Sequence, residues 1–167
     1  MFPWRTISGE EASAYYAAGT AQYHINADIM YTLRKYVQAT GDEAFLRDFG
    51  AEMLVETARL WLDLGFYSGA RGGKFCINGV TGPDEYNAVV NNNAYTNLMA
   101  RENLRYATQV VQSLRATEPD AYNALAHKMA LEPSEVSEWM RAAENMPCPR
   151  GWVIGLCVWR RRWCELP

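Results

Sequence analysis

Apolar residues recur at helical spacing over most of the chain, and the first clear series lies between Tyr23 and Gly41. It comprises Ile25, Ile29, Leu33 and Val37, which lie four residues apart. Such spacing places them on one face of a helix. Gly41 then breaks the pattern, as glycine commonly does after the last helical residue. The pattern predicts an amphipathic helix over residues 23–40.

A second helical stretch is predicted from Asp42-Glu43 to Leu64. The two carboxylates stand where the amino end of a helix favours negative charge. The apolar positions that follow are Phe45, Leu46, Phe49, Met53, Leu54, Leu60, Trp61 and Leu64. Gly50 divides this series and Gly65 ends it. We expect the two stretches to form a helical hairpin.

Between residues 65 and 93 the pattern changes to glycine, asparagine and proline. Only residues 74–77, Lys-Phe-Cys-Ile, have the character of a short strand. We therefore expect a long loop here, and loops of this length within compact domains are commonly functional.

Three further helices are predicted after the loop. The first opens at Asn93, a good amino cap, and its periodic positions run to Leu114. The others cover residues 122–129 and 134–145 and are entered through Pro119-Asp120 and Pro133-Ser134. Up to residue 146 the chain therefore predicts an all-α fold.

The segment from Pro147 onward does not continue this pattern. It concentrates Trp, Cys and Arg with the period of neither a helix nor a strand. We expect one domain fragment over residues 2–146 and an aberrant tail over 147–167, and our hypothesis is that a frameshift in the coding sequence produced the tail. The alternative is a basic-aromatic tail for membranes or nucleic acid, but no amphipathic face forms on any register.

Composition narrows the function classes. The net charge of −3 supplies no large positive field, so nucleic acid is not an expected partner. The amino end has no signal-peptide pattern, and no stretch reaches the ~18 apolar residues of a membrane helix, so we expect a cytoplasmic protein with no membrane partner. The four cysteines lack paired metal-ligand spacing and are expected to be free thiols, with no metal.

The strongest local candidate for chemistry is Gly79-Val80-Thr81-Gly82-Pro83-Asp84-Glu85-Tyr86. Gly82-Pro83 forces a turn, and Asp84 and Glu85 then follow on rigid backbone. A carboxyl group fixed in this way suits general acid catalysis, because the proton must lie within hydrogen-bond reach of the leaving oxygen. Taken alone, the pair is more typical of a solvated surface turn.

Other polar residues stand near this segment or at the start of the chain. Asn91 to Asn97 supply amides that can bind sugar hydroxyls without the desolvation cost of charge, or that serve only as caps and turns. Glu10-Glu11 form a second acidic site in a polar loop, and His24 begins the first clear helix. Surface charge and a structural histidine are the alternatives there.

Several motifs together resemble glycoside hydrolase family 65, the maltose phosphorylase group that includes the kojibiose, nigerose and trehalose phosphorylases. The matching segments, in the family's order over residues 2–146, are Phe2-Pro3-Trp4-Arg5-Thr6, Ser8-Gly9-Glu10-Glu11, Tyr23-His24-Ile25-Asn26, Thr40-Gly41-Asp42-Glu43, the Gly79 to Tyr86 segment and Asn91-Asn92-Asn93-Ala94-Tyr95-Thr96-Asn97.

The resemblance implies a partial (α/α)6 barrel with Glu85 as the catalytic acid. Such enzymes cleave an α-glucosidic disaccharide with inorganic phosphate as co-substrate, invert the configuration to give β-glucose 1-phosphate, and need no metal or organic cofactor. Because phosphate is already an anionic nucleophile, one carboxylic acid is enough. The expected sugar-binding residues are Trp4, Glu10, Glu11, Tyr15, His24, Asp84 and Asn93.

The loop from Ala12 to Tyr16 is similar to that of kojibiose- or nigerose-type members, so the expected substrate is a kojibiose-, nigerose- or maltose-type disaccharide. The family's phosphate-binding loop and Lys-Gln pair lie beyond this chain's matching part. We therefore expect an inactive fragment of a parent enzyme, with a homodimer as the parent's assembly. A glycosidase that uses water, with Glu10 or Glu11 as the base, and a non-catalytic sugar-binding or pseudogene product are the alternatives.

Overall fold

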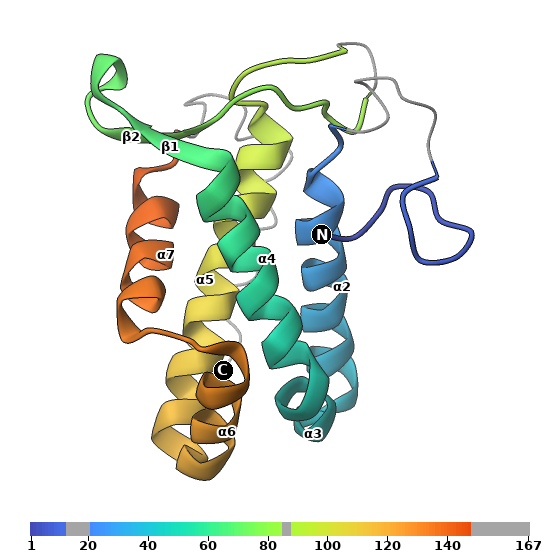
Figure 1. Cartoon of the computed structure of the whole chain (residues 1–167), viewed down its shortest axis with the longest axis vertical. Helices are drawn as coiled ribbons and strands as arrows, with labels where there is room; N and C mark the ends of the chain where they lie inside the picture. The colour runs from blue at the N-terminus through green and yellow to red at the C-terminus, as the bar shows by residue number, and fades with distance from the viewer. Residues whose placement is uncertain (13–20, 85–87, 148–167) are drawn as a thin grey trace.

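The computed structural model describes residues 1–12, 21–84 and 88–147. Long helices dominate it, and they lie roughly along the long axis of the molecule (Figure 1). Its elements are α2 (His24–Thr40), α3 (Glu43–Phe45), the π-helical turn η1 (Leu46–Gly50), α4 (Ala51–Leu64), β1 (Gly65–Ser68), the 3-10 turn η2 (Gly69–Arg71), β2 (Lys74–Ile77), α5 (Ala94–Thr117), α6 (Pro119–Met129) and α7 (Pro133–Asn145). The prediction of an all-α fold is confirmed, with one small hairpin added.

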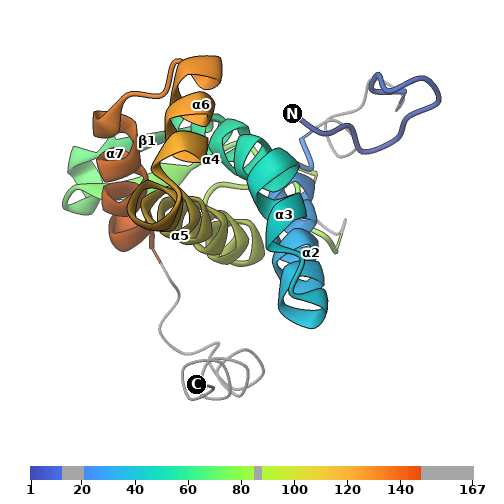
Figure 2. The same ribbon diagram turned by 90° about the horizontal axis from the view of Figure 1, so that it is seen from below.

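Helix α5 occupies the centre of the bundle. It packs against α2, α4, α6 and α7, and the view from below shows it between them (Figure 2). Alanines at the contacts are fully buried and allow the helix axes to approach closely, among them Ala58, Ala100, Ala107 and Ala142. The largest fully buried side chains are Trp61 of α4 and Trp139 of α7. The core therefore lies on both sides of α5.

The predicted helix boundaries are confirmed where capping chemistry is explicit. Gly41 ends α2 with a φ of 70° and donates its N–H to the Val37 carbonyl. The Asp42 side chain accepts from the Phe45 N–H at 3.0 Å and starts α3. Pro119 and Pro133 stand in the first turns of α6 and α7. These helices begin a few residues earlier than their apolar patterns alone predicted.

The helical period was expected to continue past Gly50 as far as Gly65, and η1 does lead directly into α4. A Cβ at Gly50 would lie 3.0 Å from both Leu33 Cδ2 and Leu46 Cδ1. Glycine is therefore used here for a close approach to α2 and not as a helix stop.

The expected loop after residue 65 contains a strand that the pattern did not predict. The predicted strand Lys74–Ile77 is present, and it pairs antiparallel with Gly65–Ser68. The hairpin extends from the end of α4 at the top of the bundle (Figure 1). The segment is therefore a hairpin followed by the polar loop that carries the candidate chemistry.

Candidate functional site

The polar loop after β2 is fixed at both ends by backbone hydrogen bonds. Val80 and Val90 exchange N–H···O=C bonds of 3.0 and 2.8 Å, so they close residues 81–89 into a loop. The Thr81 hydroxyl donates to the Ala88 carbonyl across the same loop. The backbone on either side of the predicted acidic turn is thus held in place.

Three consecutive asparagines, Asn91 to Asn93, follow this loop. The first two accept hydrogen bonds from the backbone just before it. The Asn91 side chain accepts from the Gly79 N–H at 3.0 Å, and the Asn92 side chain accepts from the Ile77 N–H at 3.2 Å. Asn92 has a φ of 54°, a backbone conformation that asparagine tolerates better than most residues. Here asparagine serves turns and caps, the alternative that the sequence left open.

Asn93 caps α5 and also packs against the loop. Its side chain accepts from the Thr96 N–H at 3.0 Å. A Cβ at Gly82 would lie 2.5 Å from Asn93 Nδ2, so the glycine is required for this contact. The Gly82-Pro83 turn therefore packs against the amino end of α5. A sugar-binding role for Asn93 stays a prediction.

The structure places Asp84 at an exposed position just after this turn. The predicted general acid Glu85 and the predicted sugar-binding Tyr15 lie outside the described residues. Their roles stay predictions that rest on the sequence.

A partly buried polar cluster lies where α2 and α5 begin. His24 Nδ1 lies 2.9 Å from Asp28 Oδ2, and the Tyr95 hydroxyl donates to Asp28 Oδ1 at 2.8 Å. The His24 and Tyr95 rings meet edge to face, with centroids 5.6 Å apart. Burial and the bond to Asp28 raise the pKa of Tyr95 to about 12, so the phenol keeps its proton at neutral pH.

The cluster adjoins the polar loop through the backbone. The Thr81 N–H donates to the Ala21 carbonyl at 3.0 Å, three residues before His24. Asn93, which touches Gly82, stands two residues before Tyr95. The predicted residues His24 and Asn93 are therefore brought to one end of the bundle. Asp28 and Tyr95 were not predicted, although the four-residue spacing of His24 and Asp28 on one helix was a usable signal.

The predicted residues Trp4, Glu10 and Glu11 lie in a separate amino-terminal loop beside α2 (Figure 1). The Glu11 carboxylate accepts from the Trp4 N–H at 2.6 Å and from the Arg5 N–H at 3.3 Å. The Phe2 N–H donates to Asn26 Oδ1 at 2.7 Å and attaches the loop to the helix. Glu11 thus stabilises the loop itself, while Glu10 and the Trp4 side chain are exposed.

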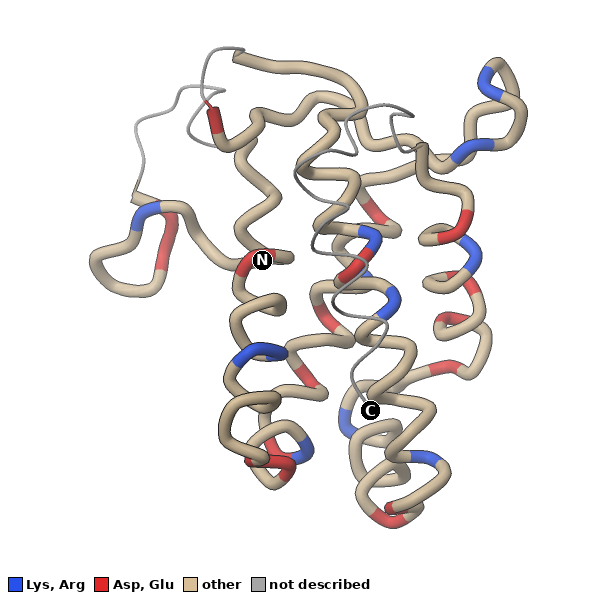
Figure 3. The backbone as a smooth tube through the Cα atoms, turned by 180° about the vertical axis from the view of Figure 1, so that it is seen from behind, with Lys and Arg blue, Asp and Glu red and all other residues tan. Residues whose placement is uncertain are grey.

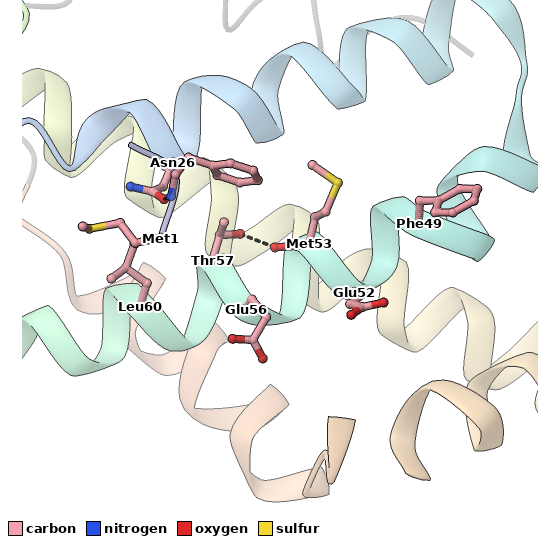
Figure 4. A pocket seen from close by; sticks show the side chains of 9 residues that line it. Met1, Asn26, Phe49, Glu52, Met53, Glu56, Thr57 and Leu60 are labelled. Atoms are coloured by element: carbon pink, nitrogen blue, oxygen red, sulfur yellow. Dashed lines mark hydrogen bonds between the residues drawn. The ribbon is translucent and has the colours of Figure 1, made fainter. Parts of the chain in front are cut away.

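A groove of about 320 Å³ lies on another face, between α2 and α4 (Figure 4). It is lined by Met1, Phe2, Asn26, Phe49, Glu52, Met53, Glu56, Thr57 and Leu60. Its two carboxylates are ion-paired, because Glu52 contacts Lys128 at 2.5 Å and Glu56 contacts Arg59 at 3.1 Å. None of the lining residues belongs to the polar loop, so the groove is not part of the candidate site.

Charged residues of both signs are interspersed along the helices (Figure 3). Within residues 1–12, 21–84 and 88–147, His, Cys, Asp and Glu form no group of three suited to a metal ion. Cys76 is buried as a free thiol. None of the described helices combines the length and the apolar character that crossing a bilayer requires.

Comparison with known proteins identifies the family. Residues 1–161 match the glycosyl hydrolase family 65 central catalytic domain. The alpha,alpha-trehalose phosphorylase of Thermoanaerobacter brockii is 56% identical over 149 residues, which cover 89% of this chain and 19% of that protein. The kojibiose phosphorylase of Caldanaerobacter subterraneus subsp. tengcongensis is 38% identical over 131 residues, covering 78% of this chain and 17% of that protein.

A comparison of structures agrees with this family assignment. A solved structure described as a candidate kojibiose phosphorylase from the human microbiome matches with a TM-score of 0.73 at 27% identity. The match covers 83% of this chain and 20% of that chain. The helices described above are consistent with the predicted partial (α/α)6 barrel. The chain spans about a fifth of the length of these relatives.

Proposed function

Because the chain belongs to glycosyl hydrolase family 65 and matches its central catalytic domain, we propose that it contributes the general acid of a disaccharide phosphorylase. The reaction is cleavage of an α-glucosidic bond by inorganic phosphate, with inversion to β-glucose 1-phosphate. The observation that carries the proposal is the 56% identity to a trehalose phosphorylase over 89% of the chain.

In this proposal Glu85 protonates the glycosidic oxygen as the bond to glucose breaks. Phosphate attacks the opposite face of the sugar ring and needs no base, because it is already an anion. The contacts on either side of the acid support this role, because Val80 pairs with Val90 and Gly82 packs against Asn93. Positioned flanking residues help to place a catalytic group.

For the substrate we propose α,α-trehalose over the kojibiose-, nigerose- and maltose-type sugars that the acceptor loop favoured. The identity of 56% to a trehalose phosphorylase exceeds the 38% to a kojibiose phosphorylase. A direct comparison of both disaccharides as substrates, with phosphate present, tests this choice.

The hydrolase alternative needs a second carboxylate that is free to activate water. Glu11 is poorly suited, since its two oxygens accept from the Trp4 and Arg5 amides. Glu10 is exposed in the same loop. Phosphate as the nucleophile is supported by the relatives, which are named as phosphorylases.

The test is Glu85→Gln in a protein that carries this chain within the full family length. We expect kcat for phosphorolysis to fall by roughly 10²–10⁴-fold, the usual contribution of a general acid. Glucose 1-phosphate release should require phosphate in the unsubstituted protein. Asp63→Asn, at an exposed position of α4 outside the polar loop, is the control and should leave kcat unchanged. Unchanged activity in Glu85→Gln, or turnover without phosphate, would contradict the proposal.

By the same reasoning, the 167-residue chain alone should show no phosphorolysis of trehalose, kojibiose or maltose. Release of glucose 1-phosphate by the purified chain would refute this expectation.

A further inference from the structure

Asn78 is the only asparagine in the sequence that is followed by glycine. Asparagine is a chemically labile residue, and its side-chain amide is most open to attack when the next residue has no Cβ beside the backbone nitrogen. Asn78 and Gly79 are both exposed in the structure, so water reaches them. A Cβ at Gly79 would meet nothing within 4 Å, so no neighbour crowds the dipeptide. The pair therefore has the composition and the exposure that spontaneous deamidation requires.

Deamidation at this dipeptide needs water as its only co-reactant. The Gly79 backbone nitrogen forms a bond to Asn78 Cγ as the Cγ–Nδ2 bond breaks, and the proton of the attacking nitrogen leaves with the amide group as ammonia. The product is a cyclic succinimide. Water then opens the ring at one of its two carbonyls, which gives aspartate or isoaspartate at position 78. Because the attacking nitrogen must give up its proton, a group that holds this N–H slows the reaction.

The structure contains such a group. The Gly79 N–H donates to Asn91 Oδ1 at 3.0 Å, and Asn92 Nδ2 donates to Asn78 Oδ1 at 3.2 Å. The attacking nitrogen and the side chain that it attacks are therefore bound to two different residues beyond the polar loop. An amide that donates a hydrogen bond in the fold becomes reactive only when the segment opens locally.

The backbone around Asn78 is held to the same segment. The Ile77 N–H donates to Asn92 Oδ1 at 3.2 Å, and the Asn92 N–H donates to the Ile77 carbonyl at 2.7 Å. Val80 pairs with Val90 on the other side. Deamidation therefore requires contacts between residues 77–80 and residues 90–92 to break first.

We propose that Asn78-Gly79 is a deamidation site and that Asn91 restrains the reaction by holding the Gly79 N–H. Both products place a carboxylate at position 78. Isoaspartate also adds a methylene group to the main chain two residues before Val80, where the polar loop is closed. The modification therefore alters the base of this loop. The inference requires nothing of the proposed reaction, and it is tested without any measurement of activity.

Peptide mapping by mass spectrometry, after incubation of the 167-residue chain in mildly alkaline buffer, tests the site. Trypsin releases residues 75–101 as one peptide, and tandem spectra distinguish Asn78 from the other asparagines in it. We expect the mass change from amide to acid to appear at Asn78 before any other asparagine, with aspartate and isoaspartate both formed. Asn78→Gln should abolish it, because glutamine would have to close a larger ring. Modification that appears first at another asparagine overturns the site.

Two substitutions at the exposed Asn91 test the restraint. Asn91→Ala removes the acceptor of the Gly79 N–H, whereas Asn91→Asp keeps an acceptor oxygen. We expect the rate at Asn78 to rise about fivefold in Asn91→Ala, the factor that one ordinary hydrogen bond contributes, and not to rise in Asn91→Asp. Hydrogen exchange of the Gly79 amide should be faster in Asn91→Ala alone. Equal deamidation rates in all three chains, or the same rise in Asn91→Asp, overturn the restraint.

Opening of the whole fold is the competing route, and Asn103→Ala separates the two. Asn103 bonds to Trp61 and Thr57 in the core, so its loss weakens the fold and leaves the contacts of the polar loop in place. If the opening is local, the rate at Asn78 should match that of the unsubstituted chain. A faster rate in Asn103→Ala overturns the local restraint. Far-ultraviolet circular dichroism establishes that each variant is folded.

Discussion

The buried indole N–H of Trp61 in α4 has its hydrogen-bond acceptor on the neighbouring helix α5. Its N–H donates to Asn103 Oδ1 at 2.9 Å, and Asn103 Nδ2 donates to the Thr57 hydroxyl at 3.1 Å. Thr57 in turn donates to the Met53 carbonyl at 2.9 Å, a bond drawn in Figure 4. One amide therefore joins α4 to α5 through polar groups that water cannot reach.

Asn103→Ala should reduce the free energy of unfolding by about 2–3 kcal/mol, because it leaves the buried indole N–H without an acceptor and removes packed volume. Equilibrium unfolding in urea measures the change. Gln112→Ala, at an exposed position of the same helix, is the control and should change stability little. Equal losses in the two variants would show that the buried network adds nothing specific.

Glu135 connects two helices through a short, partly buried ion pair. Its carboxylate accepts from Arg59 at 2.7 and 2.9 Å, and Arg59 also donates to the Met129 carbonyl at 3.0 Å. The hydrogen bond from Arg59 is the main cause that lowers the pKa of Glu135 below its usual value of 4.5, against the opposing effect of burial.

This shift predicts a pH dependence of stability. A carboxyl group whose pKa is lower in the folded state stabilises the fold above its unfolded value of 4.5, and that contribution disappears as the pH falls through the folded pKa. At pH 7 the free energy of unfolding should therefore be larger for the unsubstituted chain than for the Glu135→Gln variant. The difference between the two should shrink below pH 4.5. Urea unfolding across this range measures it, with Glu144→Gln as the control on an exposed position of α7. A difference that stayed constant down to pH 2 would contradict the assignment.

At the scale of elements, the β1–β2 hairpin requires glycine at position 65. The residue pattern within β1 does not show why. Gly65 pairs with Ile77. A Cβ at Gly65 would lie 2.1 Å from Phe75 Cζ, well inside contact distance. Phe75 is 2% exposed and its ring packs edge to face with Tyr67 at 5.1 Å, so it has little room to move.

Gly65→Ala should therefore destabilise the chain by about 2 kcal/mol through overpacking. Gly69→Ala is the matched control, since a Cβ there meets nothing within 4 Å and its φ is not positive. Thermal unfolding of the two variants measures the difference. If both variants unfold at the same temperature as the parent chain, the ring of Phe75 is not the obstacle described here.

The hairpin also shows where prediction from sequence stopped. Lys74–Ile77 was predicted as a strand from its own composition, whereas Gly65–Ser68 was expected to be loop. Its extended form is stabilised by pairing with β2, and a local pattern carries no information about pairing. The close approach of Gly50 to Leu33 of α2 is likewise non-local, so the sequence did not show why a glycine stands there.

The helices and their caps were predictable because their signals are local. Gly41, Asp42, Asn93 and Pro133 each act within one turn of their own helix. At the candidate site, His24 and Asn93 were predicted by residue type and motif, but the contacts that orient them come from other helices. The spacing of His24 and Asp28 was a local signal, whereas the contact of Tyr95 with Asp28 requires α2 and α5 to lie side by side.

At the scale of the whole molecule, one end of the helical hairpin exposes an aromatic cluster formed by Tyr36, Phe45 and Phe49. Phe45 lies with its ring centroid 5.5 Å from each of the other two, and Phe49 is 61% exposed. Clustered exposed aromatics promote association in water. A partial barrel also leaves helix faces without the neighbours that would cover them, which favours self-association in the same way.

We expect the 167-residue chain to self-associate in a concentration-dependent manner, and Phe49→Ser to weaken that association by removing the most exposed ring. Sedimentation velocity over a range of concentrations measures it. Phe66→Ser is the control, because Phe66 is 46% exposed but lies on the hairpin. A monodisperse monomer at all concentrations, or equal effects of the two variants, would contradict the prediction.

The central place of α5 has a consequence for synthesis on the ribosome. Residues 24–64 emerge before α5 and form a hairpin whose apolar face, including Leu54, Val55 and Trp61, is covered in the finished fold. Much of that cover is α5, which is complete only at Thr117. A nascent chain must therefore carry an uncovered apolar surface while some fifty further residues are translated. During that interval chaperones can bind the uncovered apolar surface of this hairpin.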